Sequence, residues 1–301
     1  MKTFLKEESG SVIILVVLCM TVFIGSIAFV IDMGSLYLEK NRLQKIVDAA
    51  ALAGAQELPS SETKARQEVY KTIELNDDDL KQFTTSINSD STLIEVSGEK
   101  QGTLFFAKVL GLREPTIKAS AVVQLQPLTT GKGSIPLGVQ PSMNLSFGSL
   151  QTLKVSDSAY GHFGAIALTG PGAKDYETDL KNGYEFDLTV GITLNTQTGQ
   201  LAGPTRRAVL DRISRCPNAT YLNYPPNCSR VVLIPIYEPV QTDQKQIKQV
   251  KVVGFGSFFL EDVATTSEGA EVTGRFIQFS QLGTSSPNQV NYGTFGFKLV
   301  Q

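Results

Sequence analysis

Residues 11–31 read SVIILVVLCMTVFIGSIAFVI, and this run contains no charged side chain. As an α-helix it would be about 30 Å long, because each residue adds about 1.5 Å, and about 30 Å is the thickness of the hydrocarbon core of a bilayer. The run therefore predicts a transmembrane helix. The positions that mark it are Ser11, Val12, Gly25 and Ile31.

The helical pattern continues beyond the apolar run. Residues 32–58 contain good helix formers and no proline before Pro59. Leu36, Leu43 and Ala50 follow one another at heptad spacing, which is typical of a helix with one buried face. We therefore expect one continuous helix that anchors the chain in a membrane and then runs into the body.

A cleaved signal peptide is the alternative interpretation of the same run. Lys2 and Lys6 form a basic start, and Ser26 and Ala28 have the small-x-small spacing of a cleavage site. Cleavage there would make the mature chain a secreted protein. The uninterrupted helical pattern after residue 31 favours the anchor.

Basic residues lie on both sides of the run and do not decide its orientation. Lys2 and Lys6 precede it, whereas Lys40, Arg42 and Lys45 follow it closely and oppose a cytoplasmic N-terminus. A long downstream body can be translocated regardless of such charges. We expect a single-pass protein of the cell membrane, with its N-terminus cytoplasmic and its body extracytoplasmic.

Several features of the segment from residue 8 to residue 58 occur together: Gly10 and Ser11 before the span, Asp32 at its end, Leu43 and Gln44, and the tract DAAALA at residues 48–53. With these features the segment resembles the N-terminal Tad segment of TadG-like proteins, which belong to Flp (tight adherence) pilus systems. Parts of the chain after residue 160 also resemble the C-terminal region of some Tad-domain proteins. The resemblance implies a membrane-anchored component of pilus assembly or of a related secretion apparatus.

The segment departs from pilin-like relatives at one position. Five residues after Gly10 stands Leu15, where prepilin-type cleavage usually requires an acidic residue. This departure speaks against processing at Gly10 and against a pilin-like subunit. The chain also has no room for the von Willebrand type A domain that larger TadG-like proteins carry.

The helix after the span is the expected interaction surface. A carboxylate at the end of an apolar run either reaches the membrane interface or pairs with a cation of a neighbouring span. Small side chains in the alanine tract allow another backbone to approach closely, although alanine also simply favours helix. The expected partners are the membrane, pilus or secretion subunits, and a second copy of the chain. The residues expected to make helix contacts are Asp32, Leu36, Leu43, Gln44, Asp48, Ala49, Ala50, Ala51, Ala53 and Gly54.

The body predicts an α+β fold. Alternating residues indicate strands over 83–89, 92–99 and 116–125, residues 102–111 (GTLFFAKVLG) are predicted as an amphipathic helix, and most later segments indicate strands in a sandwich or partly closed barrel. Two short helices are expected, one before Gly183 and one starting near Pro204. The expected divisions are a membrane anchor and long helix (1–58), a small α+β module (59–126), a linker (127–141) and a mainly β domain (142–301).

Composition narrows the chemistry of the body. The 27 Lys and Arg residues are balanced by 29 Asp and Glu residues without a long run of either sign, which excludes an electrostatic footprint for nucleic acid. A single histidine, His162, argues against a histidine-rich metal site. We expect no cofactor and no enzymatic activity.

Cys216 and Cys228 bracket a loop rich in proline and asparagine, and we expect them to form a disulfide in an oxidising compartment, with two free thiols as the alternative. A different class of function would be an anchored extracytoplasmic enzyme or ligand-binding module acting on a cell-surface substrate. Its thiol nucleophile would need His162 and a carboxylate such as Asp211 beside one of the cysteines.

A candidate anion site lies at the start of the helix predicted near Pro204. Glycines lead into this helix, whose free N–H groups lie next to two arginines. A helix-start turn with two surface arginines is the simpler interpretation. The candidate residues are Gly203, Thr205, Arg206 and Arg207.

Overall fold

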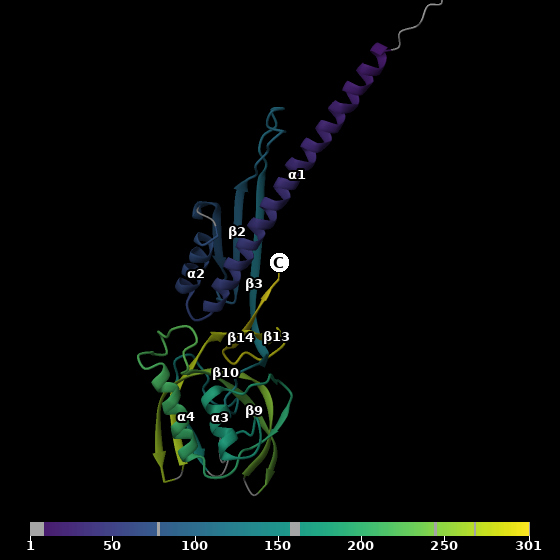
Figure 1. Ribbon diagram of the computed structural model, residues 1–301. Helices are drawn as coiled ribbons and strands as arrows, with labels where there is room; N and C mark the ends of the chain where they lie inside the picture. Colours follow the sequence, from purple (N-terminus) through teal and green to yellow (C-terminus); the bar gives the residue numbers. More distant parts are fainter. Residues whose placement is uncertain (1–8, 77–78, 157–162, 244–245, 268, 301) are drawn as a thin grey trace, which may run out of the picture.

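The computed structural model describes residues 9–76, 79–156, 163–243, 246–267 and 269–300. It begins with α1, Ser9–Glu57, an uninterrupted helix of 49 residues. At about 1.5 Å per residue this helix is roughly 70 Å long, more than twice what a bilayer core needs. The expected continuous helix is confirmed, and Figure 1 shows its N-terminal part projecting away from the rest of the protein.

In the first module, which comprises α1 and the elements before residue 132, the C-terminal part of α1 packs against a second helix and a sheet. Helix α2, Glu62–Glu74, starts at Ser61, whose hydroxyl caps the helix by accepting from the N–H of Lys64 at 3.3 Å. The other elements before residue 132 are the 3-10 turn η1 (Leu80–Gln82) and the strands β1 (Phe83–Ile87), β2 (Leu93–Gln101) and β3 (Thr116–Gly131). The three strands pair antiparallel, and their alternate apolar residues pack on α1 and α2.

The second module is a curled sheet whose one face is covered by two helices (Figure 1). Its main strands have the order β5-β11-β10-β9-β4-β6, and β8 pairs with β10. Register shifts along β10 mark bulges, which bend a strand and increase its twist. Residues of both helices share one hydrophobic core with the sheet. The elements are β4 (Leu137–Val139), β5 (Leu150–Ser156), β6 (Phe163–Ala165), α3 (Ala173–Asn182), β7 (Leu188–Thr189), β8 (Thr193–Asn195), α4 (Ala202–Arg215), β9 (Val231–Asp243), β10 (Gln246–Thr266) and β11 (Gly269–Ile277).

The last strands return to the first module. They are β12 (Phe279–Ser280), β13 (Gly283–Ser285) and β14 (Thr294–Leu299). Strand β14 pairs antiparallel with residues 123–127 of β3, and Phe295 enters the core around α1. From the sequence we expect β14 to belong to the domain 142–301 and residues 127–131 to be part of a linker. In the structure, residues 127–131 are the end of β3. The class α+β, with a long N-terminal helix and a mainly β C-terminal region, is confirmed.

The predicted amphipathic helix over residues 102–111 is wrong. The segment between β2 and β3 is a loop of consecutive turns, in which the N–H of Val109 donates to the carbonyl of Phe106 at 3.0 Å and the N–H of Leu110 to that of Ala107 at 3.1 Å. Its preceding N–H groups donate to a carboxylate on α1, described below. The apolar residues do have helical spacing. The hydrogen bonds to this carboxylate, which is distant in sequence, hold the segment as a loop instead.

Candidate functional site

The apolar half of α1 is bare. The side chains of Val12, Phe23 and Ile31 are 58, 65 and 43 % exposed. Apart from the adjacent backbone of the helix, no described atom lies within 4 Å of where a side chain on Gly25 would begin. Ser11 lies in the same helix. The helix is long and apolar enough to cross a membrane, and none of its most apolar stretch is covered by the rest of the protein. The predicted span therefore lies in a helix segment that the body leaves free.

Asp32, the first charged residue after the apolar run, binds a loop of its own chain. Its Oδ1 accepts the N–H of Phe105 at 2.8 Å and that of Phe106 at 3.1 Å, and its Oδ2 accepts the N–H of Ala107 at 2.6 Å. The side chain is only 2 % exposed. The sequence suggested an interfacial charge or a partner for a cation of a neighbouring span. Three backbone donors stand where such a cation would bind, and the interfacial position stays a prediction.

The middle of α1 contacts the chain at the end of β2 and the strand β3. Leu36 packs so closely on Gly102 that a Cβ atom there would lie 2.4 Å from its Cδ2 atom. Leu43 is buried in the core, and the amide nitrogen of Gln44 donates to the carboxylate of Asp48 and to the carbonyl of Ser120, each at 2.8 Å. The predicted contact residues in this part of the helix thus meet the chain's own strands.

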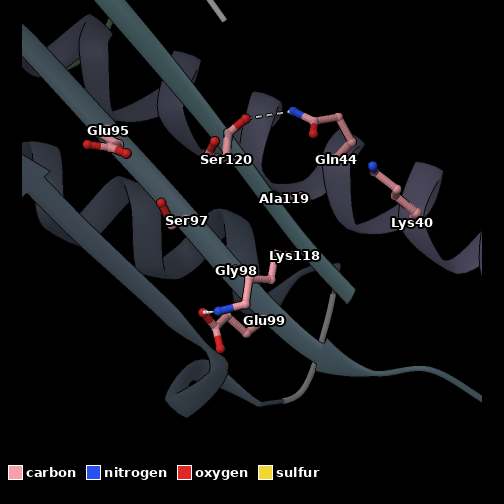
Figure 2. Close-up of a pocket in the computed structure, with 9 residues that line it drawn as sticks. All are labelled: Lys40, Gln44, Glu95, Ser97, Gly98, Glu99, Lys118, Ala119 and Ser120. Atoms are coloured by element: carbon pink, nitrogen blue, oxygen red, sulfur yellow. Dashed lines mark hydrogen bonds and ion pairs between the residues drawn. The ribbon is translucent and has the colours of Figure 1, made fainter. Parts of the chain in front are cut away.

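An open hollow of about 580 Å³ lies beside this contact, between α1 and the strands β2 and β3. Figure 2 shows the bond from Gln44 to Ser120 at its rim and polar side chains on the strands. Lys118 pairs with Glu99 there, so both charges have a partner. The lining residues are Lys40, Gln44, Glu95, Ser97, Gly98, Glu99, Lys118, Ala119 and Ser120.

The alanine tract of α1 is mostly used within the chain. Ala50 and Ala51 are fully buried, and Gly54 faces α2 and the sheet, where a Cβ atom would lie 2.6 Å from Val69 Cγ2 and 2.7 Å from Ile94 Cδ1. Ala49 is exposed and Ala53 half-buried. The close backbone approach that small residues permit therefore takes place here against the protein's own body.

Cys216 and Cys228 form the expected disulfide, with their Cα atoms 5.7 Å apart. The bond lies in a small core with Phe259 and Ile277. A thiol nucleophile at either cysteine is incompatible with this bond. Asp211 binds Lys181 and Arg215 at 2.9 Å, and the hydrogen bond from Lys181 lowers the pKa of its carboxyl.

His162, the third member of the catalytic alternative, lies outside the described residues. Within the part of the chain that the structure describes, no group of three or more His, Cys, Asp or Glu side chains is placed to hold a metal ion. The catalytic alternative therefore gains no support from the arrangement of these residues.

Two buried arginines support the disulfide loop, and sequence reasoning missed both. Arg212 donates to the carbonyl of Ser229 at 2.8 Å, and burial lowers its pKa to about 10. Arg230 donates to the carbonyls of Leu260 and Ala219 and stacks 4.5 Å from the ring centre of Phe259. Nothing in the sequence around either arginine distinguishes it as buried rather than exposed.

The candidate anion residues are largely engaged with α3. Arg207 Nε donates to Glu177 Oε1 at 2.9 Å, which lowers the pKa of Glu177 and raises that of Arg207. The hydroxyl of Thr205 is buried and lies 2.9 Å from the hydroxyl of Tyr176. Gly203 and Arg206 are exposed in the first turns of α4. Anion binding at this helix start stays a prediction. Arg206 could bind an anion there directly, whereas Arg207 would first have to give up its ion pair with Glu177.

The comparisons with known proteins bear on α1. No curated protein and no solved structure matches the chain. The family model described as "Putative Flp pilus-assembly TadE/G-like" matches residues 10–57, which is α1 almost from end to end and none of the body. The N-terminal helix of this protein is thus similar to the Tad segment of TadE/G-like proteins.

Proposed function

We propose that this protein is a membrane-anchored accessory or structural component of Flp-type pilus assembly, or of a related secretion apparatus, and that it acts through protein–protein contacts. The observation that carries the proposal is that the helix matching the Tad family is bare over residues 12–31 and held in the body over residues 43–58. Such a helix can sit in a bilayer and fix a folded body to its surface.

The partner surface on α1 is restricted by what the body already covers. Beyond Asp32 the large apolar side chains of Tyr37 and Leu38 are 67 and 68 % exposed. They lie after the end of the apolar run, where the described residues of the body leave these side chains uncovered and open to a partner. We assign the contact with pilus or secretion subunits, or with a second copy, to this face rather than to the buried alanine tract.

The proposed topology places the N-terminus in the cytoplasm and the body outside. The disulfide between Cys216 and Cys228 supports an oxidising, extracytoplasmic location for the body, because such bonds are rare in reducing compartments. Protease added to spheroplasts should digest the body and leave a fragment that contains the apolar half of α1. A body that resists digestion until the membrane is lysed would contradict this topology.

Crosslinking in cells tests the proposed role. A photo-reactive amino acid at position 37 or 38 should give adducts with a pilus or secretion subunit, or with a second copy of the chain. Lys174 on α3 is a matched control, because it is also exposed but lies on the second module. Absence of adducts from both helix positions, or the same adducts from position 174, would overturn the proposed contact surface.

A further inference from the structure

The loop between β2 and β3 exposes an unusual number of large apolar side chains. Phe105 and Leu112 are 58 and 59 % exposed, Phe106 is 45 % exposed, and Val109 and Leu110 are 85 and 81 % exposed. Single exposed apolar residues are common on proteins, but a contiguous group marks an interaction site. This loop therefore presents an apolar surface that is open to a partner.

The position of the loop identifies that partner. The N–H of Thr103 donates to Glu39 at 3.0 Å, and the N–H groups of Phe105 to Ala107 donate to Asp32, where the apolar run ends. The loop thus follows α1 toward the proposed membrane by about 10 Å, since Glu39 and Asp32 are separated by seven residues at about 1.5 Å each. Figure 1 shows this loop extending beyond the rest of the body along α1.

The charges of the loop fit a bilayer surface. Lys108 lies between the apolar residues and pairs with Glu114 at 3.0 Å, and Arg113 is exposed. Long basic side chains beside buried apolar groups can extend their charged ends to lipid headgroups. A bilayer would meet the apolar side chains of the loop and the bare helix as one continuous apolar surface.

We infer that residues 105–112 form a second membrane contact, which inserts its exposed apolar side chains into the leaflet from which α1 emerges. Asp32 fixes the loop to α1, so that helix and loop together hold the body at one height and tilt on the bilayer. This inference rests on the proposed membrane anchoring by α1. It assigns to the loop a lipid ligand rather than a protein partner.

Tryptophan fluorescence tests the inference cleanly, because the chain contains no tryptophan. Three full-length variants, each with one tryptophan, are reconstituted in vesicles of phosphatidylethanolamine and phosphatidylglycerol with and without bromine on the acyl chains. Leu110→Trp reports on the loop, and Phe23→Trp reports on the anchor. Leu222→Trp is the matched control, because Leu222 is 62 % exposed and lies in the disulfide loop of the second module.

We expect brominated lipid to quench most of the fluorescence of Leu110→Trp and Phe23→Trp, and the emission of Leu110→Trp to lie to the blue of that of Leu222→Trp. Quenching of Phe23→Trp without that of Leu110→Trp would overturn the loop contact and leave the anchor intact. Failure to quench Phe23→Trp would overturn the proposed anchoring itself. A blue-shifted but unquenched Leu110→Trp would mean that protein covers the loop, which also overturns the inference.

The role of Asp32 is tested in the Leu110→Trp background. Adding Asp32→Ala removes both acceptor oxygens and should reduce the quenching at position 110. The same substitution in the Phe23→Trp background should leave its quenching unchanged. Equal quenching of Leu110→Trp with and without Asp32 would overturn the proposed role of Asp32 as the fixing residue.

Discussion

Asp32 joins two parts of the chain that are more than seventy residues apart. An ionised carboxylate only accepts hydrogen bonds, and here its two oxygens take the N–H groups of three successive residues, 105–107. Hydrogen bonds to an ionised acceptor are stronger than those between neutral groups. The loop is therefore held to α1 through its backbone, which leaves its apolar side chains free to face outward.

Replacing Asp32 by Ala should release this loop without unfolding the core. The amide hydrogens of residues 105–107 should then exchange with solvent faster, because they lose their acceptor, and hydrogen exchange followed by mass spectrometry measures this on the full chain. The amides of β2, which pair with β3, provide the internal control. Unchanged exchange at residues 105–107 would show that another acceptor holds the loop.

The disulfide closes a loop between residues twelve apart in sequence. Replacing Cys216 and Cys228 by Ser together should lower the free energy of unfolding by about 3 kcal/mol on the chain-entropy account. Chemical denaturation of the full chain in detergent measures this change. Cys19→Ser is the control, because Cys19 is a free, exposed cysteine in the apolar run and should leave the midpoint unchanged.

At the scale of elements, α1 changes surroundings along its length without a break. No other described segment covers its first part, its middle meets a loop and the strand β3, and its last part is buried between α2 and the sheet. The sequence predicted both the span and the continuous helix, because apolarity and helix propensity are local properties. It could not distinguish an alanine tract that meets a partner from one that meets its own sheet, because both require small side chains at the same spacing.

The close packing at Gly54 allows that difference to be measured. Gly54→Leu would push a side chain into Val69 and Ile94, and overpacking of this kind typically costs about 1–3 kcal/mol. Ala49→Leu is the matched control on an exposed position of the same helix, and surface changes usually stay within about 0.5 kcal/mol. Thermal unfolding of both variants in detergent compares them. Equal midpoints would mean that the tract is not packed inside the body.

At the scale of the molecule, the strand β3 connects the two modules. β3 pairs with β2 and β14 in one module and reaches β7 and β13 at its other end. The alternating pattern of residues 294–299 predicts a strand. The pattern within one strand does not show which other strand it pairs with. The predicted boundary therefore followed a cluster of proline and glycine near residue 130, through which the chain passes while still in β3.

Phe295 provides a test of this connection, because it is 3 % exposed and belongs to the core around α1. Phe295→Ala should destabilise the first module by about 3–5 kcal/mol, the usual cost of removing a buried phenylalanine ring. Faster proteolysis between α2 and β2 would report the effect, with Leu282→Ala, at an 81 % exposed position, as the control. Damage confined to peptides after residue 142 would contradict the shared core.

The pairing of β14 with β3 also sets an order of events during synthesis. Chains are made from the N-terminus, so α1 and the strands β1 to β3 are synthesised long before residues 294–299. Until then β3 presents an unpaired edge, which is a template for joining other chains. The seat of α1 is complete only when residues 294–299 have been made, so synthesis of the last strand closes the open edge of β3.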